Sequence, residues 1–106
     1  MWFTANILME CLSSDPTAKP FWEESIILIQ AADEDEARKK GEETGKKAEH
    51  EYDAISGDHI KWVFDRVADI YELVPNKLEE GTEVFSRFLR DSEVKSLSRP
   101  FEDDEI

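Results

Sequence analysis

Apolar and polar side chains alternate along residues 2–12. Every odd-numbered position from Phe3 to Cys11 is apolar, whereas the even-numbered positions mix apolar and polar residues. A period of two is typical of a β-strand with one face against a core. Residues 21–30 predict a second strand, central and covered on both faces, because positions 26–29 are apolar on both parities.

The next segment predicts an α-helix. Asp33 can cap the helix while Glu36, three positions on, reaches back to the cap, and acidic residues occupy the first turn. Acid–base pairs at i,i+4 then recur as far as Lys47. One stripe at helical spacing consists of small residues and a final tyrosine: Ala37, Gly41, Thr44 or Gly45, Ala48 and Tyr52. We expect this helix to lie close to a sheet and to end at the turn formed by residues 55–58.

Residues 59–73 are rich in β-branched and aromatic side chains and predict a long strand with a bulge near its middle. A helix over residues 62–73 is the alternative, because several apolar side chains there also recur at helical spacing. These are Val63, Val67, Ile70 and Tyr71. A fourth strand is predicted over residues 82–90. Its two alternating sets are Val84, Ser86 and Phe88, and Phe85, Arg87 and Leu89.

The predicted order of elements is strand-strand-helix-strand-strand. It indicates an α+β fold, a four-stranded, mostly antiparallel sheet with one helix packed on one face. Residues 1–91 form this single domain, and residues 92–106 form a short helical turn and an acidic, mobile tail. The other sheet face is left uncovered, and the eleven aromatic residues would make it an exposed apolar patch. We therefore expect a two-fold homodimer through that face, unless residues 62–73 are a helix that covers it.

Charge narrows the classes of partner. The chain has 106 residues, of which 26 are acidic and 13 basic, so its net charge is −13. Nucleic acid and anionic membrane surfaces would be repelled, and we expect neither as a partner. The chain has no run of about 18 apolar residues and no basic, cleavable N-terminal segment, which favours a cytoplasmic location. The lone Cys11 has no second cysteine for a disulfide or zinc site and is expected to be a small buried side chain in its strand.

No catalytic, cofactor-binding or metal-binding residues are predicted, and the chain is not expected to be an enzyme. His50 and His59 lack the spacing of metal ligands, and no serine lies in a nucleophile motif. Glu23 and Glu24 place one carboxylate on each face of their strand. We expect an internal or inter-subunit ion pair with Arg66, Arg87 or Arg90; a functional carboxylate and simple solvent exposure are the alternatives.

Aromatic and acidic residues occur together in the second half of the chain. Aromatic anchors supply affinity at protein interfaces, and an acidic surface attracts a basic partner. The candidate partner-binding residues are Trp62, Phe64, Asp65, Asp69, Tyr71 and Glu72. We predict a protein–protein interaction module, an adaptor or an immunity-type inhibitor of a basic partner protein. The alternatives are a small-ligand sensor or minor enzyme, with a pocket between helix and sheet or at the dimer interface, and aromatic residues that only form the core.

Five blocks of sequence together resemble a bacterial family of domains of unknown function of about this length. The blocks are Trp2-Phe3-x-Ala5-Asn6-x-Leu8, Trp22-Glu23-Glu24-Ser25-Ile26-x-Leu28-Ile29, Ala32-x-Glu34-x-Glu36-Ala37, Val67-x-Asp69-x-Tyr71-Glu72-Leu73 and Gly81-Thr82-Glu83-Val84-Phe85-Ser86-Arg87-Phe88-Leu89. The resemblance implies a stand-alone bacterial α+β domain. It brings no catalytic residues with it and leaves the activity open.

Overall fold

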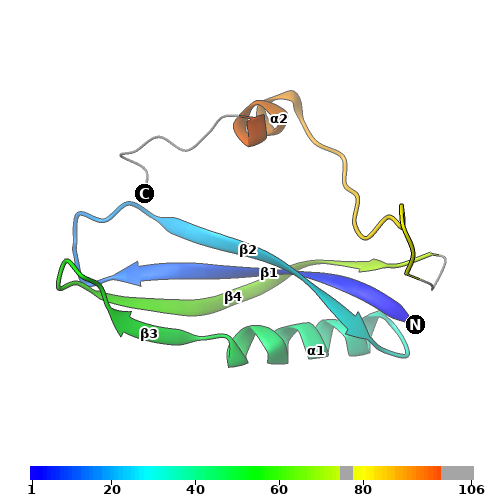
Figure 1. Cartoon of the computed structure of the whole chain (residues 1–106), viewed down its shortest axis with the longest axis horizontal. Helices are drawn as coiled ribbons and strands as arrows, with labels where there is room; N and C mark the ends of the chain where they lie inside the picture. The colour runs from blue at the N-terminus through cyan, green and yellow to red at the C-terminus, as the bar shows by residue number, and fades with distance from the viewer. Residues whose placement is uncertain (75–77, 99–106) are drawn as a thin grey trace.

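The computed structural model describes residues 1–74 and 78–98, and within them a four-stranded sheet with two helices (Figure 1). The elements in chain order are β1 (Trp2–Ser13), β2 (Phe21–Gln30), α1 (Glu34–Lys47), β3 (His50–Asp53), β4 (His59–Glu72) and α2 (Asp91–Ser98). Each strand pair is antiparallel, and the strand order is β2-β1-β4-β3. The predicted α+β class and four-stranded antiparallel sheet are confirmed. The central, doubly covered position predicted for residues 21–30 is wrong, because β4 pairs with β1 and leaves β2 at the edge, with Ile26 and Leu28 exposed. The helical alternative for residues 62–73 is wrong, since they lie in β4 up to Glu72.

Helix α1 begins as the sequence predicts and ends earlier. The amide of Glu36 donates to Oδ1 of Asp33 at 2.8 Å, so the predicted N-cap is confirmed. The predicted end at residues 55–58 is wrong, because the helix stops at Lys47. The chain then enters β3, whose backbone pairs with the start of β4. Tyr52 therefore lies in a strand, although it continues the helical stripe in sequence.

The inward side of α1 consists of its small residues. Ala37, Gly41 and Gly45 are the buried residues of the helix. A Cβ atom added at Gly41 would meet Val67 at 3.2 Å and Ala5 at 3.3 Å, which shows how closely the helix approaches the sheet. The core around this contact includes Phe3, Ala5, Ile7, Met9, Ile29, Ala31, Ala37 and Val67.

Two bulges in β4 keep its apolar side chains on the α1 side of the sheet. Phe64, Val67 and Ile70 lie opposite Met9, Ile7 and Ala5 of β1, respectively. Three residues of β4 thus span each two-residue step of β1, and the register shifts twice. The sequence predicts one bulge. Because each bulge adds a residue, the apolar positions recur every three residues, which is why this strand resembles a helix in sequence.

Residues 82–85 lie against the sheet face opposite α1 without joining the sheet. The Thr4 hydroxyl donates to the carbonyl of Val84 at 2.6 Å, and the Tyr71 hydroxyl donates to Glu83 Oε1 at 2.6 Å. The rings of Tyr71 and Phe85 meet edge to face at 6.1 Å. Residues 82–85 therefore cover one end of this face, and the strand predicted over residues 82–90 is wrong.

Residues 86–98, here called the arm, lead away from the sheet to α2 (Figure 1). Helix α2 spans eight residues where the sequence predicts a single turn, and none of its residues is buried. The acidic tail predicted after it lies outside the described residues. No helix in the described ranges has the length and apolar character needed to cross a membrane.

Replacing Gly45 by alanine tests the close approach of α1. The added methyl group would overlap the ring of Phe64, so the ring or the helix must move. Overpacking costs about 1–3 kcal/mol, and the gain in helix propensity from glycine to alanine offsets roughly 1 kcal/mol of it. We expect a melting temperature lower by several degrees in thermal denaturation followed by circular dichroism.

The exposed substitution Glu43→Ala is the matched control and should leave the melting temperature almost unchanged. Adding Phe64→Leu to Gly45→Ala should recover part of the loss, because the smaller side chain leaves room for the methyl group. A Gly45→Ala variant that melts higher than the wild type would contradict the packing of α1 against β4.

Candidate functional site

Helix α1 leaves one end of its sheet face uncovered. Beyond its last residue, four ring side chains gather from β2, β3 and β4. These are Phe21, His50, Tyr52 and Trp62, here called the aromatic cluster. The strand registers place Phe21, Cys11, Trp62 and His50 side by side in one row across all four strands. Three of the four rings are thus brought together by backbone pairing alone, and Tyr52 joins them from the same side of β3.

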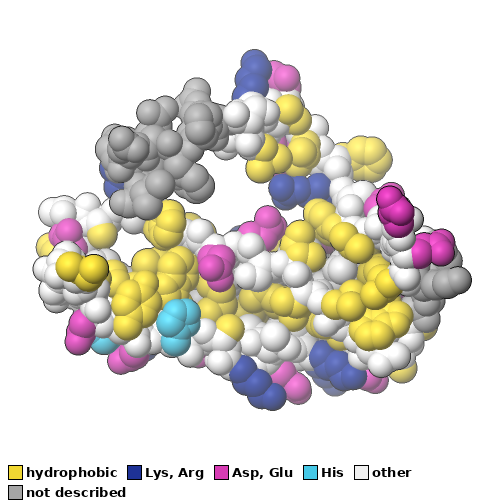
Figure 2. Space-filling view, in the orientation of Figure 1, with side chains coloured by type: hydrophobic (Ala, Val, Ile, Leu, Met, Phe, Trp, Pro, Cys, Tyr) yellow, Lys and Arg dark blue, Asp and Glu magenta, His cyan; other side chains and the backbone are white. Residues whose placement is uncertain are grey.

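The rings of the aromatic cluster contact one another and remain accessible. Phe21 and Trp62 are tilted with ring centroids 6.0 Å apart, and His50 and Tyr52 are stacked at 5.9 Å. Trp62 Nε1 donates to the Tyr52 hydroxyl at 3.4 Å, and Tyr52 is 47% exposed. Figure 2 shows hydrophobic side chains at the surface over the strands, beside a histidine. The cluster combines apolar area with polar ring atoms, as aromatic residues at interfaces do.

Cys11 lies in the middle of this row and is partly buried. Burial raises the pKa of its thiol, so the side chain stays protonated near neutral pH. It is a small spacer between Phe21 and Trp62. Its expected place inside a strand is confirmed, but it is only partly buried.

The predicted partner-binding residues do not form one surface. Trp62 belongs to the aromatic cluster, and Phe64 lies beside Gly45 under α1. Tyr71 instead contacts Glu83 and Phe85, which cover the opposite face.

The three predicted acidic residues lie at separate points along the exposed parts of β4. Asp65 is in a bulge and pairs with Arg66 at 2.7 Å, Asp69 lies opposite Asn6, and Glu72 lies opposite Phe3. Of the six predicted residues, only Trp62 lies in the aromatic cluster. The sequence analysis missed its other three members, Phe21, His50 and Tyr52. A hairpin pattern in the sequence is the signal that identifies His50 and Tyr52. They alternate before the turn at Gly57, as Ile60 and Trp62 do after it, so that His50 lies opposite Trp62 and Tyr52 lies opposite Ile60.

Glu23 and Glu24 are exposed, and neither forms an ion pair within the described ranges. Glu24 accepts a hydrogen bond from Asn6 Nδ2 at 3.2 Å, which places this carboxylate on the face opposite α1. Glu23 accepts one from the Ser25 hydroxyl at 3.4 Å. The expected internal ion pair is therefore wrong for residues 1–74 and 78–98.

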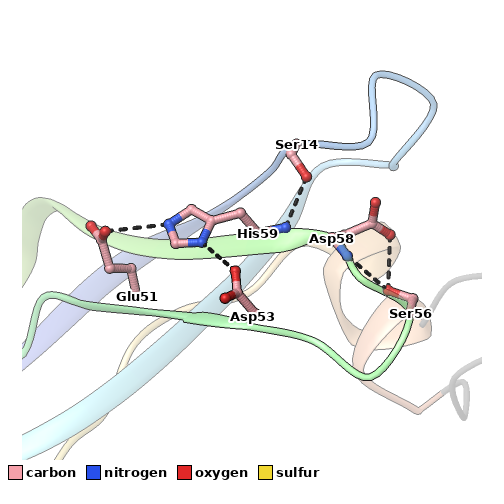
Figure 3. A network of polar contacts seen from close by, with 6 residues as sticks. All are labelled: Ser14, Glu51, Asp53, Ser56, Asp58 and His59. Atoms are coloured by element: carbon pink, nitrogen blue, oxygen red, sulfur yellow. Dashed lines mark hydrogen bonds and ion pairs between the residues drawn. The ribbon is translucent and has the colours of Figure 1, made fainter.

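A second polar group surrounds His59 at the start of β4 (Figure 3). Its Nδ1 lies 2.9 Å from Asp53 Oδ1 and its Nε2 lies 3.3 Å from Glu51 Oε1. The hydrogen bond with Asp53 is the main cause that raises the pKa of His59, and Glu51 adds to it. The Ser14 hydroxyl accepts from the backbone amide of His59 at 2.8 Å, not from its ring. This group stabilises the β3–β4 hairpin when the imidazole is protonated and is not arranged as a nucleophile with its base.

Residues 1–74 and 78–98 contain no group of three or more ligating side chains able to hold a metal ion. The two carboxylates at His59 occupy its two ring nitrogens, which leaves neither free as a metal ligand.

The chain belongs to a protein family described as a domain of unknown function, DUF4288, which it matches over residues 2–86. The resemblance stated from the sequence blocks is confirmed as membership of a family of unknown function. No curated protein and no solved structure matches the chain. The match covers the sheet, α1 and residues 82–85, and it ends where the arm begins.

The protonation of His59 makes the stability of the hairpin depend on pH. Because its folded pKa lies above the unfolded value of about 6.5, its contribution is complete below that pH and is lost as the pH rises through the folded pKa. We expect the difference in melting temperature between wild type and His59→Gln to be larger at about pH 5.5 than at about pH 8.5.

The same comparison in an Asp53→Asn, Glu51→Gln background is the control, since the neutral side chains no longer favour the imidazolium. The pH dependence should disappear there. An NMR titration that places the pKa of His59 at or below about 6.5 in the wild type would contradict this account.

Proposed function

We propose that this protein is a protein–protein interaction module that binds a basic partner protein through the aromatic cluster, as an adaptor or an immunity-type inhibitor. The observation that carries the proposal is the group of contacting rings where α1 ends short of the sheet, of which His50 and Tyr52 are exposed and Phe21 and Trp62 are partly exposed. Tryptophan and tyrosine dominate the binding energy of protein interfaces, because each buries a large area and keeps a polar atom for a hydrogen bond.

Charge determines the kind of partner. The net charge of −13 attracts a basic protein over a distance and accelerates encounter. Two acidic residues are close to cluster residues along the chain: Glu49 directly precedes His50, and Glu23 is two positions from Phe21 along β2. Lysine or arginine side chains of the partner can lie over the faces of Trp62 and Tyr52, a contact of about 0.5–2 kcal/mol.

The proposal also includes three expectations from the sequence: the packing of α1 on one sheet face, a cytoplasmic location and a role without catalysis. Helix α1 is taken as the cover of one sheet face, supported by its contacts with Ala5, Ile29 and Val67. The location is taken as cytoplasmic, supported by the lone Cys11. The role is binding without catalysis, supported by a Ser14 hydroxyl that meets the backbone of His59 instead of its ring.

Two tryptophan substitutions test the binding surface. Trp62→Ala removes the central ring of the aromatic cluster, whereas Trp22→Ala removes an exposed tryptophan of β2 on the opposite face. Full-length wild type and both variants serve as baits in the host lysate at low salt, and the captured protein is purified for titration. We expect a basic protein that binds wild type and Trp22→Ala equally and binds Trp62→Ala about 30-fold more weakly.

Tyr52→Ala, at an exposed position of the cluster, is the second variant if Trp62→Ala lowers the melting temperature.

The association rate should fall steeply between about 50 and 500 mM salt, because exposed charges are screened. Equal binding by wild type, Trp62→Ala and Trp22→Ala, or capture of an acidic protein, would contradict the proposal. Binding that ignores salt would instead favour a small apolar ligand.

A further inference from the structure

The two edges of the sheet differ in how well they are protected. On one edge, β3 pairs with residues 59–62 of β4, and the two bulges distort β4 beyond that point. Side chains bind two of its backbone groups beyond that point: Glu49 accepts from the amide of Phe64 at 2.9 Å, and Arg38 donates to the carbonyl of Val67 at 3.2 Å. Short edge strands, bulges and charged side chains are the devices that prevent further strands from adding.

The other edge, formed by β2, is neither short nor bulged, and its only charged side chains are those of Glu23 and Glu24. Its ten residues pair with β1 in unbroken register, without a bulge, and include neither lysine nor proline. Lys40 Nζ binds the carbonyl of Gln30 at 2.7 Å, at the end of the strand. Within the described ranges, no strand pairs with the outer side of β2. Such an edge presents a row of backbone donors and acceptors to another strand.

The arm contains a segment suited to that edge. Residues 86–90 continue the alternation that predicts a strand, and Phe88 is fully exposed. In the described part of the chain, residues 85–89 make no backbone–backbone hydrogen bond. Residues 1–74 and 78–98 therefore hold a strand edge and a strand-forming segment, and neither has a strand partner within these ranges.

We propose that residues 86–90 of one copy add to the β2 edge of a second copy, and that the reciprocal exchange produces a two-fold homodimer. Residues 82–85 remain on their own sheet through Thr4 and Tyr71, and the arm projects away from that sheet (Figure 1). The homodimer expected from the sequence thus forms at an edge and not across a face. Main-chain pairing supplies the attraction, as in other cases of strand addition.

Charge complementarity favours residues 86–90 of a second copy as the strand that pairs with the β2 edge. Residues 86–90 contain Arg87 and Arg90 and no acidic residue, whereas β2 contains Glu23 and Glu24 and no basic residue. None of these four side chains forms an ion pair in residues 1–74 and 78–98. In a chain of net charge −13, the segment is a local positive charge that meets a negative edge. The exchange does not depend on the proposed partner protein, because it uses the backbone edge of β2, although Phe21 of the same strand belongs to the aromatic cluster.

Sedimentation equilibrium of the full chain with Phe88→Pro tests the strand pairing. Proline removes an amide donor, and the domain keeps its fold because this amide bonds to nothing within the described chain. We expect wild type and Phe88→Val to have twice the monomer mass of 12.3 kDa at about 100 µM, and Phe88→Pro to be a monomer. A monomeric wild type, or a Phe88→Pro variant that remains a dimer, would overturn the proposal.

Charge reversal distinguishes pairing between copies from pairing within one copy. Arg87→Glu with Arg90→Glu, and separately Glu23→Arg with Glu24→Arg, should each weaken the homodimer more than about 10-fold. An equimolar mixture should restore a one-to-one dimer, since every arm then meets an edge of opposite charge. A mixture that stays monomeric would overturn the exchange. Because Glu24 accepts from Asn6, the single variants Arg87→Glu and Glu23→Arg are used if the double variant unfolds.

Discussion

Helix α1 can lie against this sheet only because its inward positions carry no side chain larger than a methyl group. Gly41 lies over Ala5, Ile29 and Val67, and Gly45 lies over the ring of Phe64. At that separation an inward ring has no space, so a helix continued to Tyr52 would be forced off the sheet. The chain instead turns after Ala48 and adds β3 to the edge, which leaves the end of the face beyond α1 open. The close approach thus produces both the core and the site of the aromatic cluster.

The sequence predicts the elements whose signals are local. The alternation of β1 and the Asp33 cap each lie within one element, and both correspond to the structure. The apolar run of β2 predicts the strand but not its place, because β2 lies at an edge of the sheet and not at its centre. The end of α1 depends on a competition that the helical stripe does not show. Four residues of β3 gain a strand partner in β4, and this pairing outweighs the periodicity that extends to Tyr52. Residues 82–90 are the opposite case, because they have the periodicity of a strand but no strand partner among the described residues.

The candidate site was predicted only in part, because neighbours in sequence were assigned to one surface. A strand sends successive side chains to opposite faces, and each bulge of β4 reverses that assignment once more. Trp62 and Tyr71 are therefore on opposite faces, although both belong to β4. Of the predicted residues, Trp62 alone joins the aromatic cluster, and its neighbours come from strands 10 or more residues away in sequence. Such contacts follow from the register, which the sequence does not display.

Helix α1 and residues 82–85 each cover one face of the sheet, and neither reaches the far end of its face. Helix α1 stops at Lys47 on one face, and residues 82–85 cover only the Thr4 end of the other. A chain of 106 residues buries a smaller fraction of its surface than a larger domain, so some of the sheet stays open. A molecule that binds the open part of the sheet must contribute apolar surface and must also approach a protein with a net charge of −13. The basic protein proposed at the aromatic cluster meets both conditions, whereas residues 86–90 of a second copy, with two arginines and no acidic residue, meet the charge condition and extend the β2 edge instead of covering a face.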